Sequence, residues 1–436
     1  MSAPVIPGRV AYVNARLIDP ASGLDAPGGV LVHDDRILRV GADLGAGADP
    51  EGAQVVDCAG HMLAPGLVDM RVRLGEPGEE HKEDIASASR AAAAGGVTTM
   101  VALPDSAPPL DDPAMLEFVA RRAREVKLVK VYCYGAATRG NEGTEVTEIG
   151  LMQAAGALGF SDGRRAIDNP RVLTRLLKYG QAFDALLVQH PEDPQLAADG
   201  VMNAGELSTR LGLAGISPVA ELVMVERDLT LLADTGGRLH FAHLSTAAAL
   251  DRVRAAKAAG LAVTCDTAPF YFALNELAVS DYRTFAKLSP PLRAEADRQA
   301  VVAAIADGTI DAIASDHVPE DEDSKRLPFG QAAFGGVGLE TLLPIALELF
   351  HNGHLNLIEA LRPLTCGPAD LLGLPAGRLA PDAPADLVLF DPDKPGQVDR
   401  ARLHSKSKNT PFDDRLIQGR VLRTIVDGRT VFESSP

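Results

Sequence analysis

Short apolar runs alternate with longer amphipathic segments through the middle of the chain. The runs occupy residues 66–73, 97–103, 127–134, 157–161, 185–190, 239–243, 262–266 and 311–315. The segments between them are rich in alanine and have helical spacing, as in DIASASRAAAAGG and AAALDRVRAAKAAG. Eight strand–helix alternations over about 250 residues or more are typical of a (β/α)8 barrel. We therefore predict an α/β fold with a TIM-type barrel over residues 65–379.

Both ends of the chain have a different pattern. The segments AYVNARLID, GVLVHDDRILRVG and ADLVLFDPD alternate apolar and polar residues between Gly, Pro and Asp, which is typical of strands. The segment RVLRTIVDGRTVFE contains the hairpin signal Asp427-Gly428. These patterns predict a small β-sandwich that flanks the barrel and is built from residues 1–64 and 380–436.

Composition narrows the class of protein. Hydrophobic residues make up 46% of the chain but aromatic residues only 4%, so the core must consist largely of Ala, Leu, Val and Ile. A net charge of -17 argues against nucleic acid or an anionic membrane as a partner. The four cysteines form no C-x-x-C pair, and no apolar run reaches the ~18 residues of a membrane span. We therefore expect a cytoplasmic protein.

Polar residues stand at the ends of several predicted strands, where a barrel of this type places its active site. They are Arg71, Arg73, Asp105, Asp162, His190, His243, Asp316 and His317. Any one of them could be a buried hydrogen-bonding group with a structural role. Several ligand-type side chains at the same end of different strands indicate a functional site. We interpret His240 and Lys130, which lie within strands, as structural.

A series of motifs identifies a family. In order they are PGLVD, LPDS, FSDG, HPED, GELSTRLGLAGISPVAE, HFAHLST, SPPLR, DGTIDAIASDHVP, FGGVGLET and SKSKNTPF. From near residue 55 to near residue 430 the chain resembles the class I dihydroorotases of the amidohydrolase superfamily. Hydantoinases and allantoinases share this frame, but they typically carry a carboxylatable lysine at the fourth strand, where this chain has Phe160-Ser161-Asp162. The resemblance therefore favours the dihydroorotase side.

The resemblance implies a zinc-dependent hydrolysis or closure of a cyclic amide. It assigns Asp162 to the bridging carboxylate, and His190 and His243 to imidazole ligands of the metal. It assigns Asp316 to the catalytic aspartate and His317 to a substrate contact. These residue types suit zinc, which prefers His nitrogen and carboxylate oxygen.

Other positions of the family pattern are substituted. They are Arg71 and Arg73 for the H-x-H pair of the first strand, Gly75 for an arginine and Asp105 for an asparagine that bind the substrate carboxylate, Ser289 for an asparagine, Phe270 and Tyr271 for two histidines, and Glu320 for a histidine. A guanidinium has no lone pair and stays protonated, so Arg71 and Arg73 cannot bind a metal and would repel one. Gly75 removes an anion contact of about 1.5–3 kcal/mol. Metal and substrate functions are therefore altered together.

Two hypotheses about the site follow. Without zinc, the buried carboxylates would be costly unless another cation paired with them. We expect Arg71 and Arg73 to form ion pairs with Asp316, with Asp162 as a further acceptor. The alternative is a reduced site in which Asp162, His190 and His243 hold one zinc ion.

Three functions stay open at this point. The first is a pseudo-dihydroorotase of de novo pyrimidine biosynthesis that lacks a cofactor and supports aspartate transcarbamoylase, a partner that the resemblance implies for inactive homologues. The second is an active cyclic amidohydrolase with an atypical or one-zinc site. The third is a ligand-binding or scaffold protein. Barrel-type relatives are often dimers, so we also expect a homo-oligomer.

Overall fold

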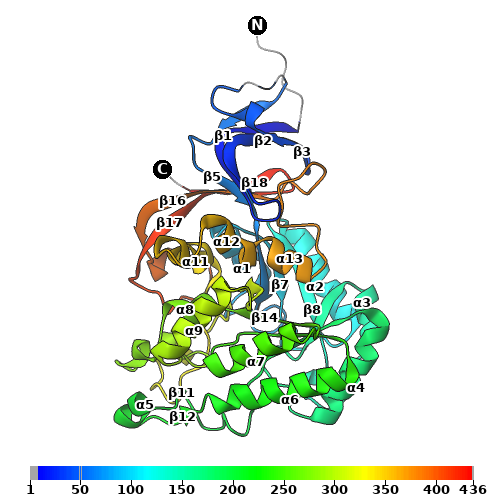
Figure 1. The fold of residues 1–436 in the computed structure, drawn as a ribbon, viewed down its shortest axis with the longest axis vertical. Helices are drawn as coiled ribbons and strands as arrows, with labels where there is room; N and C mark the ends of the chain where they lie inside the picture. The colour runs from blue at the N-terminus through cyan, green and yellow to red at the C-terminus, as the bar shows by residue number, and fades with distance from the viewer. Residues whose placement is uncertain (1–7, 49, 51, 435–436) are drawn as a thin grey trace.

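Eight parallel strands form a nearly closed barrel in the computed structural model, which describes residues 8–48, 50 and 52–434 (Figure 1). They are β6 (Leu67–Val72), β7 (Val97–Ala102), β8 (Lys130–Ala136), β9 (Ala157–Ser161), β10 (Leu186–Gln189), β13 (Arg238–Phe241), β14 (Val263–Thr267) and β15 (Ala312–Ile313). Each strand pairs with the next in chain order, and a bridge between Val72 and His317 joins the last to the first. The predicted barrel is confirmed.

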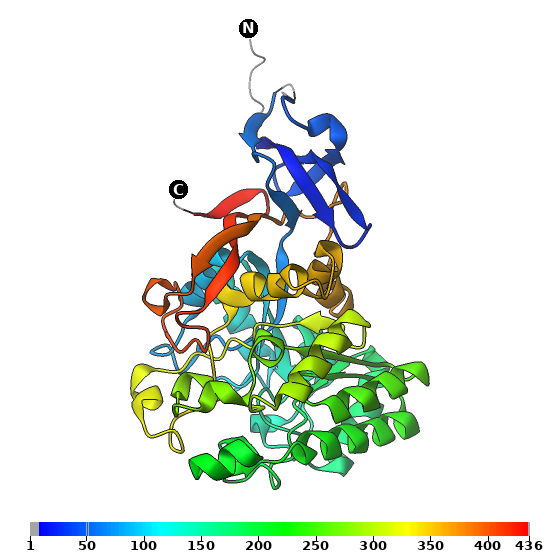
Figure 2. The ribbon, with the colours of Figure 1, turned by 60° about the vertical axis from the view of Figure 1, so that its left-hand side comes forward.

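Helices surround the barrel strands (Figures 1 and 2). They are α1 (Ile85–Ala94), α2 (Pro113–Val126), α3 (Ile149–Ala154), α4 (Pro170–Gly180), α5 (Glu206–Leu211), α6 (Val219–Thr235), α7 (Ala247–Ala258), α8 (Pro269–Ala273), α9 (Glu295–Ala306), α10 (Glu322–Arg326), α11 (Leu342–His351), α12 (Leu357–Leu361) and α13 (Cys366–Leu371). A short two-stranded sheet, β11 (Met202–Asn203) with β12 (Gly215–Ile216), lies between α4 and α6 in the chain. No helix among the described residues is both long and apolar enough to cross a bilayer.

The two ends of the chain come together in a separate β module, as predicted, and they form one eight-stranded sheet. Its strands are β1 (Arg9–Asp19), β2 (Leu24–His33), β3 (Arg36–Gly41), β4 (Gln54–Asp57), β5 (Met62–Pro65), β16 (Leu387–Gln397), β17 (Leu416–Val426) and β18 (Arg429–Glu433). Strand β5 pairs with β1 on one side and with β16 on the other, so it joins the N-terminal and C-terminal parts. In Figures 1 and 2 this sheet lies at one end of the molecule, beside the barrel.

A buried ion pair fastens this terminal sheet to the barrel. The Lys130 ammonium, at the start of β8, lies 2.6 Å from Asp386 and 2.8 Å from Asp427 of the terminal sheet. Asp386 is buried, and its second oxygen accepts a hydrogen bond from the backbone N–H of Asp427. Lys130 therefore has the structural role predicted for it.

The barrel interior is filled with side chains, so it is a core and not a channel. Val68 and Met70 of β6 and Val101 of β7 pack there, together with Leu103 just after β7 and residues of the other strands. The chain then turns outward into loops at the carboxyl ends of the strands. This arrangement brings the polar strand-end residues to one face, which we call the barrel mouth.

Candidate functional site at the barrel mouth

A cavity of about 430 Å³ opens at the barrel mouth. Its lining residues are Asp105, Ser106, Pro109, Gly140, Asn141, Arg164, Arg165, Ser289, Asp316, Val318, Phe334 and Gly335. Three of the positions selected from the sequence therefore reach this cavity: Asp105, Ser289 and Asp316. His190, His243 and Arg71 lie deeper, below its lining.

Two cationic side chains converge on one oxygen of Asp316. The Arg71 Nε lies 3.4 Å from Asp316 Oδ1, and the His243 Nε2 lies 2.9 Å from the same atom. Arg71 is only 2% exposed, and its Nη2 also donates to the Gly163 carbonyl oxygen at 3.4 Å. The expected ion pair between Arg71 and Asp316 is present, and the guanidinium fills the space beside the aspartate.

His243 is held from its other side by Asp266, the penultimate residue of β14. The Nδ1 of His243 lies 2.8 Å from Asp266 Oδ1, which also accepts the His243 backbone N–H at 2.7 Å. The second oxygen of Asp266 lies 3.0 Å from His240 Nε2. His240 is thus a supporting residue, as predicted. Asp266 was missed by the sequence reasoning, which treated it only as the end of an apolar run.

The backbone is also unusual at this point. His243 and Asp316 both have positive φ angles, 62° and 46°, in the left-handed region that residues other than glycine rarely adopt. Such conformations persist where surrounding contacts hold them in place, and they cluster at functional sites. Here the contacts of Asp266 and Arg71 provide that support.

Asp316, His243 and Asp266 form a row of three side chains, and their protonation states follow from their contacts. Burial alone would raise the pKa of Asp316, but the charges of His243 and Arg71 outweigh it and lower that pKa to about 2. Burial would lower the pKa of His243, but Asp316 and Asp266 raise it to about 9. At neutral pH the row is therefore carboxylate–imidazolium–carboxylate, with the Arg71 guanidinium beside the outer aspartate.

Arg73 points to a different group of carboxylates than expected. It forms an ion pair with Glu79, and its other nitrogens lie 3.6 Å from Asp105 and 3.9 Å from Glu320. Lys82 bridges Glu79 and Glu320 at 2.8 and 2.9 Å. Among the described residues, Arg73 forms no ion pair with Asp316 or Asp162. The expectation that Arg73 would pair with these two aspartates is therefore wrong. The physical reason is that acidic residues of the loops after β6, β7 and β15 lie closer to Arg73.

Asp162 and His190 are each engaged by neighbouring residues. Asp162 accepts the backbone N–H of Thr138 at 2.8 Å and also the Thr138 hydroxyl, and burial raises its pKa to about 6. The His190 Nε2 lies 3.4 Å from the Ser289 hydroxyl, and its buried Nδ1 has no hydrogen-bond partner among the described residues. Burial and the nearby Arg71 charge lower the pKa of His190 to about 3, so it is neutral.

The side chains that the resemblance assigns to zinc contact other protein groups in this structure. Within the described ranges, no group of three or more His, Cys, Asp or Glu side chains is arranged so that it could hold a metal. Asp162 is turned to Thr138, and both ring nitrogens of His243 lie within 2.9 Å of aspartate oxygens. A buried guanidinium 3.4 Å from Asp316 would also repel a second cation there.

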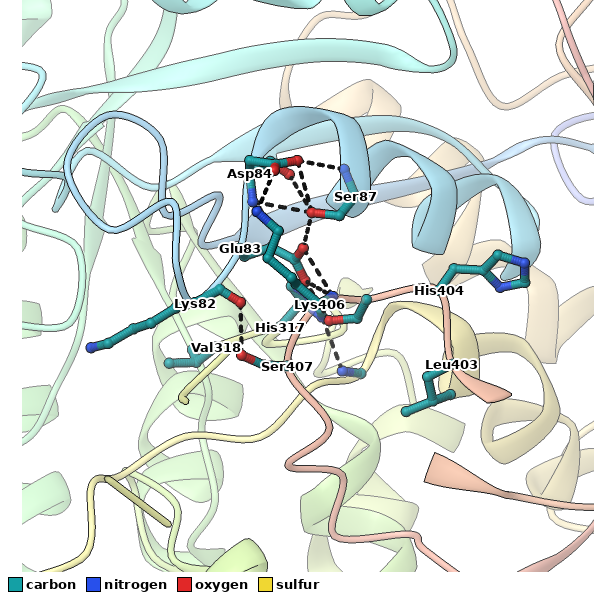
Figure 3. A network of polar contacts seen from close by, with 12 residues as sticks. Lys82, Glu83, Asp84, Ser87, His317, Val318, Leu403, His404, Lys406 and Ser407 are labelled. Carbon is teal, nitrogen blue, oxygen red and sulfur yellow. Dashed lines mark hydrogen bonds and ion pairs between the residues drawn. The ribbon is translucent and has the colours of Figure 1, made fainter. Parts of the chain in front are cut away.

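His317 lies outside the cavity lining and belongs to another polar network (Figure 3). Its Nδ1 accepts the backbone N–H of Gly338 at 3.3 Å, and its Nε2 lies 3.4 Å from Glu83 Oε2. Glu83 is fully buried and also accepts the Ser405 hydroxyl and the Lys406 backbone N–H. Figure 3 shows Glu83 close to Ser87, His317 and Lys406. The network joins the loop after β6 to the C-terminal part of the chain.

Sequence comparisons place this chain in a known family. A family model described as Dihydro-orotase-like matches residues 60–249. A dihydroorotase of Anaplasma phagocytophilum is 46% identical over 432 residues, which cover 98% of this chain and 95% of the relative. A dihydroorotase of Syntrophotalea carbinolica is 43% identical and covered over its whole length. The chain belongs to the dihydroorotase family.

Two solved structures share the fold of this dihydroorotase-family chain. The L-hydantoinase (dihydropyrimidinase) of Arthrobacter aurescens matches with a TM-score of 0.88 at 25% identity, over 98% of this chain and 96% of that one. The dihydropyrimidinase of Brevibacillus agri matches with a TM-score of 0.83 at 21% identity and shows the fold alone.

The substituted positions of this dihydroorotase-family chain have local physical consequences. Gly75 has a φ of 70°, and a Cβ there would lie 2.5 Å from the Glu83 carbonyl oxygen and 3.0 Å from that of Glu79. The loop after β6 therefore leaves no room for the family's arginine. Asp105 receives a hydrogen bond from Arg164 at 2.8 Å and faces Arg73. Burial opposes ionisation, but these arginines lower the pKa of Asp105, so it stays charged.

Proposed function

We propose that this chain is a non-catalytic member of the dihydroorotase family that serves de novo pyrimidine biosynthesis by binding aspartate transcarbamoylase. The observation that carries the proposal is the buried Arg71 guanidinium beside Asp316, in a row with His243 and Asp266. Of the residues that the resemblance assigns to catalysis and metal binding, Asp316 and His243 contact each other, and the remaining ones contact other neighbours. They therefore have a structural role in this protein.

The geometry argues against the chemistry of the family in two steps. A metal ligand must offer a free lone pair, and His243 offers none because both ring nitrogens face aspartates. A general base must reach a proton of the substrate, and Asp316 has its Oδ1 between two cations. These contacts leave His243 without a free ring nitrogen and hold Asp316 at one of its two carboxylate oxygens.

The substrate anchor is altered as well. Gly75 has no side chain, and the Asp105 carboxylate would repel a substrate carboxylate. Arg164 balances part of this charge, but it is already hydrogen-bonded to Asp105. The cavity therefore lacks the bidentate contact that the resemblance implies for carbamoyl aspartate.

A role in binding a protein partner is consistent with the rest of the molecule. The barrel and the terminal sheet are both formed, and Asp316 and Asp105 at the mouth are paired with internal cations. Association with aspartate transcarbamoylase rests on the family resemblance, in which inactive homologues support that enzyme. A homo-oligomer, also expected from the family, would be compatible with such an assembly.

The test measures three quantities on one preparation from the native host. We expect zinc well below one ion per chain after exposure to zinc, no cyclisation of carbamoyl aspartate, and co-purification of aspartate transcarbamoylase under gentle lysis. A family member with an intact H-x-H pair, purified in parallel, is the positive control. Stoichiometric zinc with turnover of order 1–1000 per second would instead establish the atypical enzyme. Absence of the transcarbamoylase would contradict the proposed partner.

A further inference from the structure

A second cavity, of about 490 Å³, lies away from the barrel mouth. Its walls come from α2, the first residues of β8, the turn before β9, and the turn between β17 and β18. The mouth residues follow their strands, whereas Lys130 and Gly156 lie at or before the start of theirs. The second cavity is therefore at the opposite end of the barrel, where the terminal sheet joins it. Figure 1 shows α2 and α3 beside β8 in this region.

The interior of this cavity is mainly apolar. Leu116 of α2, Val129 and Val131 near the start of β8, Leu158 of β9 and Val426 of β17 contribute to the lining. Leu116, Val129 and Val426 are buried, whereas Val131 and Leu158 are partly exposed. An apolar wall open to solvent gains free energy when an apolar group covers it.

Basic residues stand at its rim. Arg124 is paired with Glu117, and Lys130 is paired with Asp386 and Asp427. The other two cations lack a carboxylate partner among the described residues. Within the described part of the chain, the Lys127 ammonium makes no hydrogen bond or ion pair, and Arg429 donates only to the Lys127 carbonyl oxygen, at 3.3 Å.

These two uncompensated cations stand out on a chain with a net charge of -17. Pockets of about 300–1,000 Å³ with apolar walls and a few polar groups are typical of small-molecule sites, and they occur preferentially where domains meet. The second cavity satisfies these criteria of volume, lining and position.

We propose that the second cavity binds a small amphiphilic anion: an apolar body against Leu116, Val131 and Leu158, and one carboxylate at Lys127 and Arg429. The apolar body is either an acyl chain or an aromatic ring system, since both would cover the same walls. The site is independent of the barrel mouth and of any catalytic activity.

The absence of tryptophan from the chain allows a specific assay. Leu128, half-buried in the cavity wall, is replaced in the variant Leu128→Trp, so that its fluorescence reports on the cavity. Decanoate and 2-naphthoate are titrated separately and distinguish the two kinds of apolar body. Isothermal titration calorimetry of the unmodified full chain with the same two compounds guards against blockage of the cavity by the new side chain. A Leu277→Trp reporter, at a residue that is 60% exposed and outside the cavity, is the control for fluorescence.

Charge reversal then tests the rim. In Lys127→Glu and in Arg429→Glu we expect affinity to fall by about tenfold or more, the effect of losing one charge-assisted contact. Arg121→Glu, a charge reversal on the same helix but outside the cavity, should leave the affinity unchanged. Saturable one-to-one binding of either compound with this pattern supports the site. The proposal is overturned if calorimetry and fluorescence both show no saturable binding, or if Arg121→Glu weakens binding as much as Lys127→Glu.

Discussion

The ion pair between Arg71 and Asp316 can be tested by its effect on stability. We replace Arg71 with methionine, which keeps much of the length of the side chain and removes the charge. Two unit charges 3.4 Å apart attract by about 5 kcal/mol at an effective dielectric of about 20, and the burial of the guanidinium offsets part of this. Removing one partner of a buried pair typically costs about 3–5 kcal/mol. Because His243 still contacts the same Asp316 oxygen, we expect the lower end, about 3 kcal/mol.

The measurement is the free energy of unfolding from urea titrations followed by circular dichroism. Asp316→Asn alone should also destabilise, because it leaves the Arg71 charge buried without its partner. The double variant should cost clearly less than the sum of the two single variants, since each already removes the same interaction. Arg165→Met, at an exposed arginine that lines the same cavity, is the matched control and should stay within about 0.5 kcal/mol. An Arg71→Met protein as stable as the unmodified chain, or strictly additive variants, would refute the role of Arg71 as a replacement cation.

Further predictions concern the metal, the network in Figure 3 and pH. The double variant Arg71→His/Arg73→His should gain zinc, measured by elemental analysis after dialysis, because it supplies lone pairs and removes two positive charges; equal zinc content in the variant and the parent would contradict this. Glu83→Ala should lower the free energy of unfolding by about 2–4 kcal/mol, since it leaves the buried donors around it unpaired, whereas a change below 0.5 kcal/mol would show that the network contributes little. The Asp84 side chain caps α1, and despite partial burial the contacts with Lys406 and Ser87 lower its pKa to about 2. Its contribution should therefore be complete above the unfolded-state pKa of about 3.9 and be lost as the pH falls toward 2. The difference in unfolding free energy between the parent and Asp84→Ala should shrink over that interval, and a constant difference from pH 7 to pH 2 would count against the assignment.

The strands of the barrel could be predicted because buried parallel strands are apolar on both faces. Their ends were less accurate for identifiable reasons. The third run was expected to begin at residue 127, but Lys127 ends α2 in a left-handed conformation, so β8 begins at Lys130. The sixth apolar run was expected to extend to residue 243, but β13 ends at Phe241, and His243, which has a positive φ, follows it.

The site could be predicted only in part. The residues at strand ends were found because the fold fixes where strands end, and the pair of Arg71 with Asp316 followed from charge balance. The partners of Arg73 could not be found this way, because they lie on loops whose path depends on tertiary contacts. Asp266 had a usable signal, since an aspartate inside the apolar run VTCDT is costly to bury without partners.

The contact between Glu83 and Ser405 also bears on how the protein is made. These residues are 322 positions apart, so the loop after the first barrel strand cannot be completed until nearly the whole chain has left the ribosome. Strand β5 waits equally long for its partner β16. During synthesis the nascent chain therefore carries an unpaired strand edge and an acidic side chain without its final donors, for as long as some 300 residues take to be added. Contacts of such long range slow folding and leave intermediates prone to aggregate. We expect the yield of native protein to depend on chaperones that bind early nascent chains, and C-terminal truncations before Leu403 to be recovered mainly as aggregates.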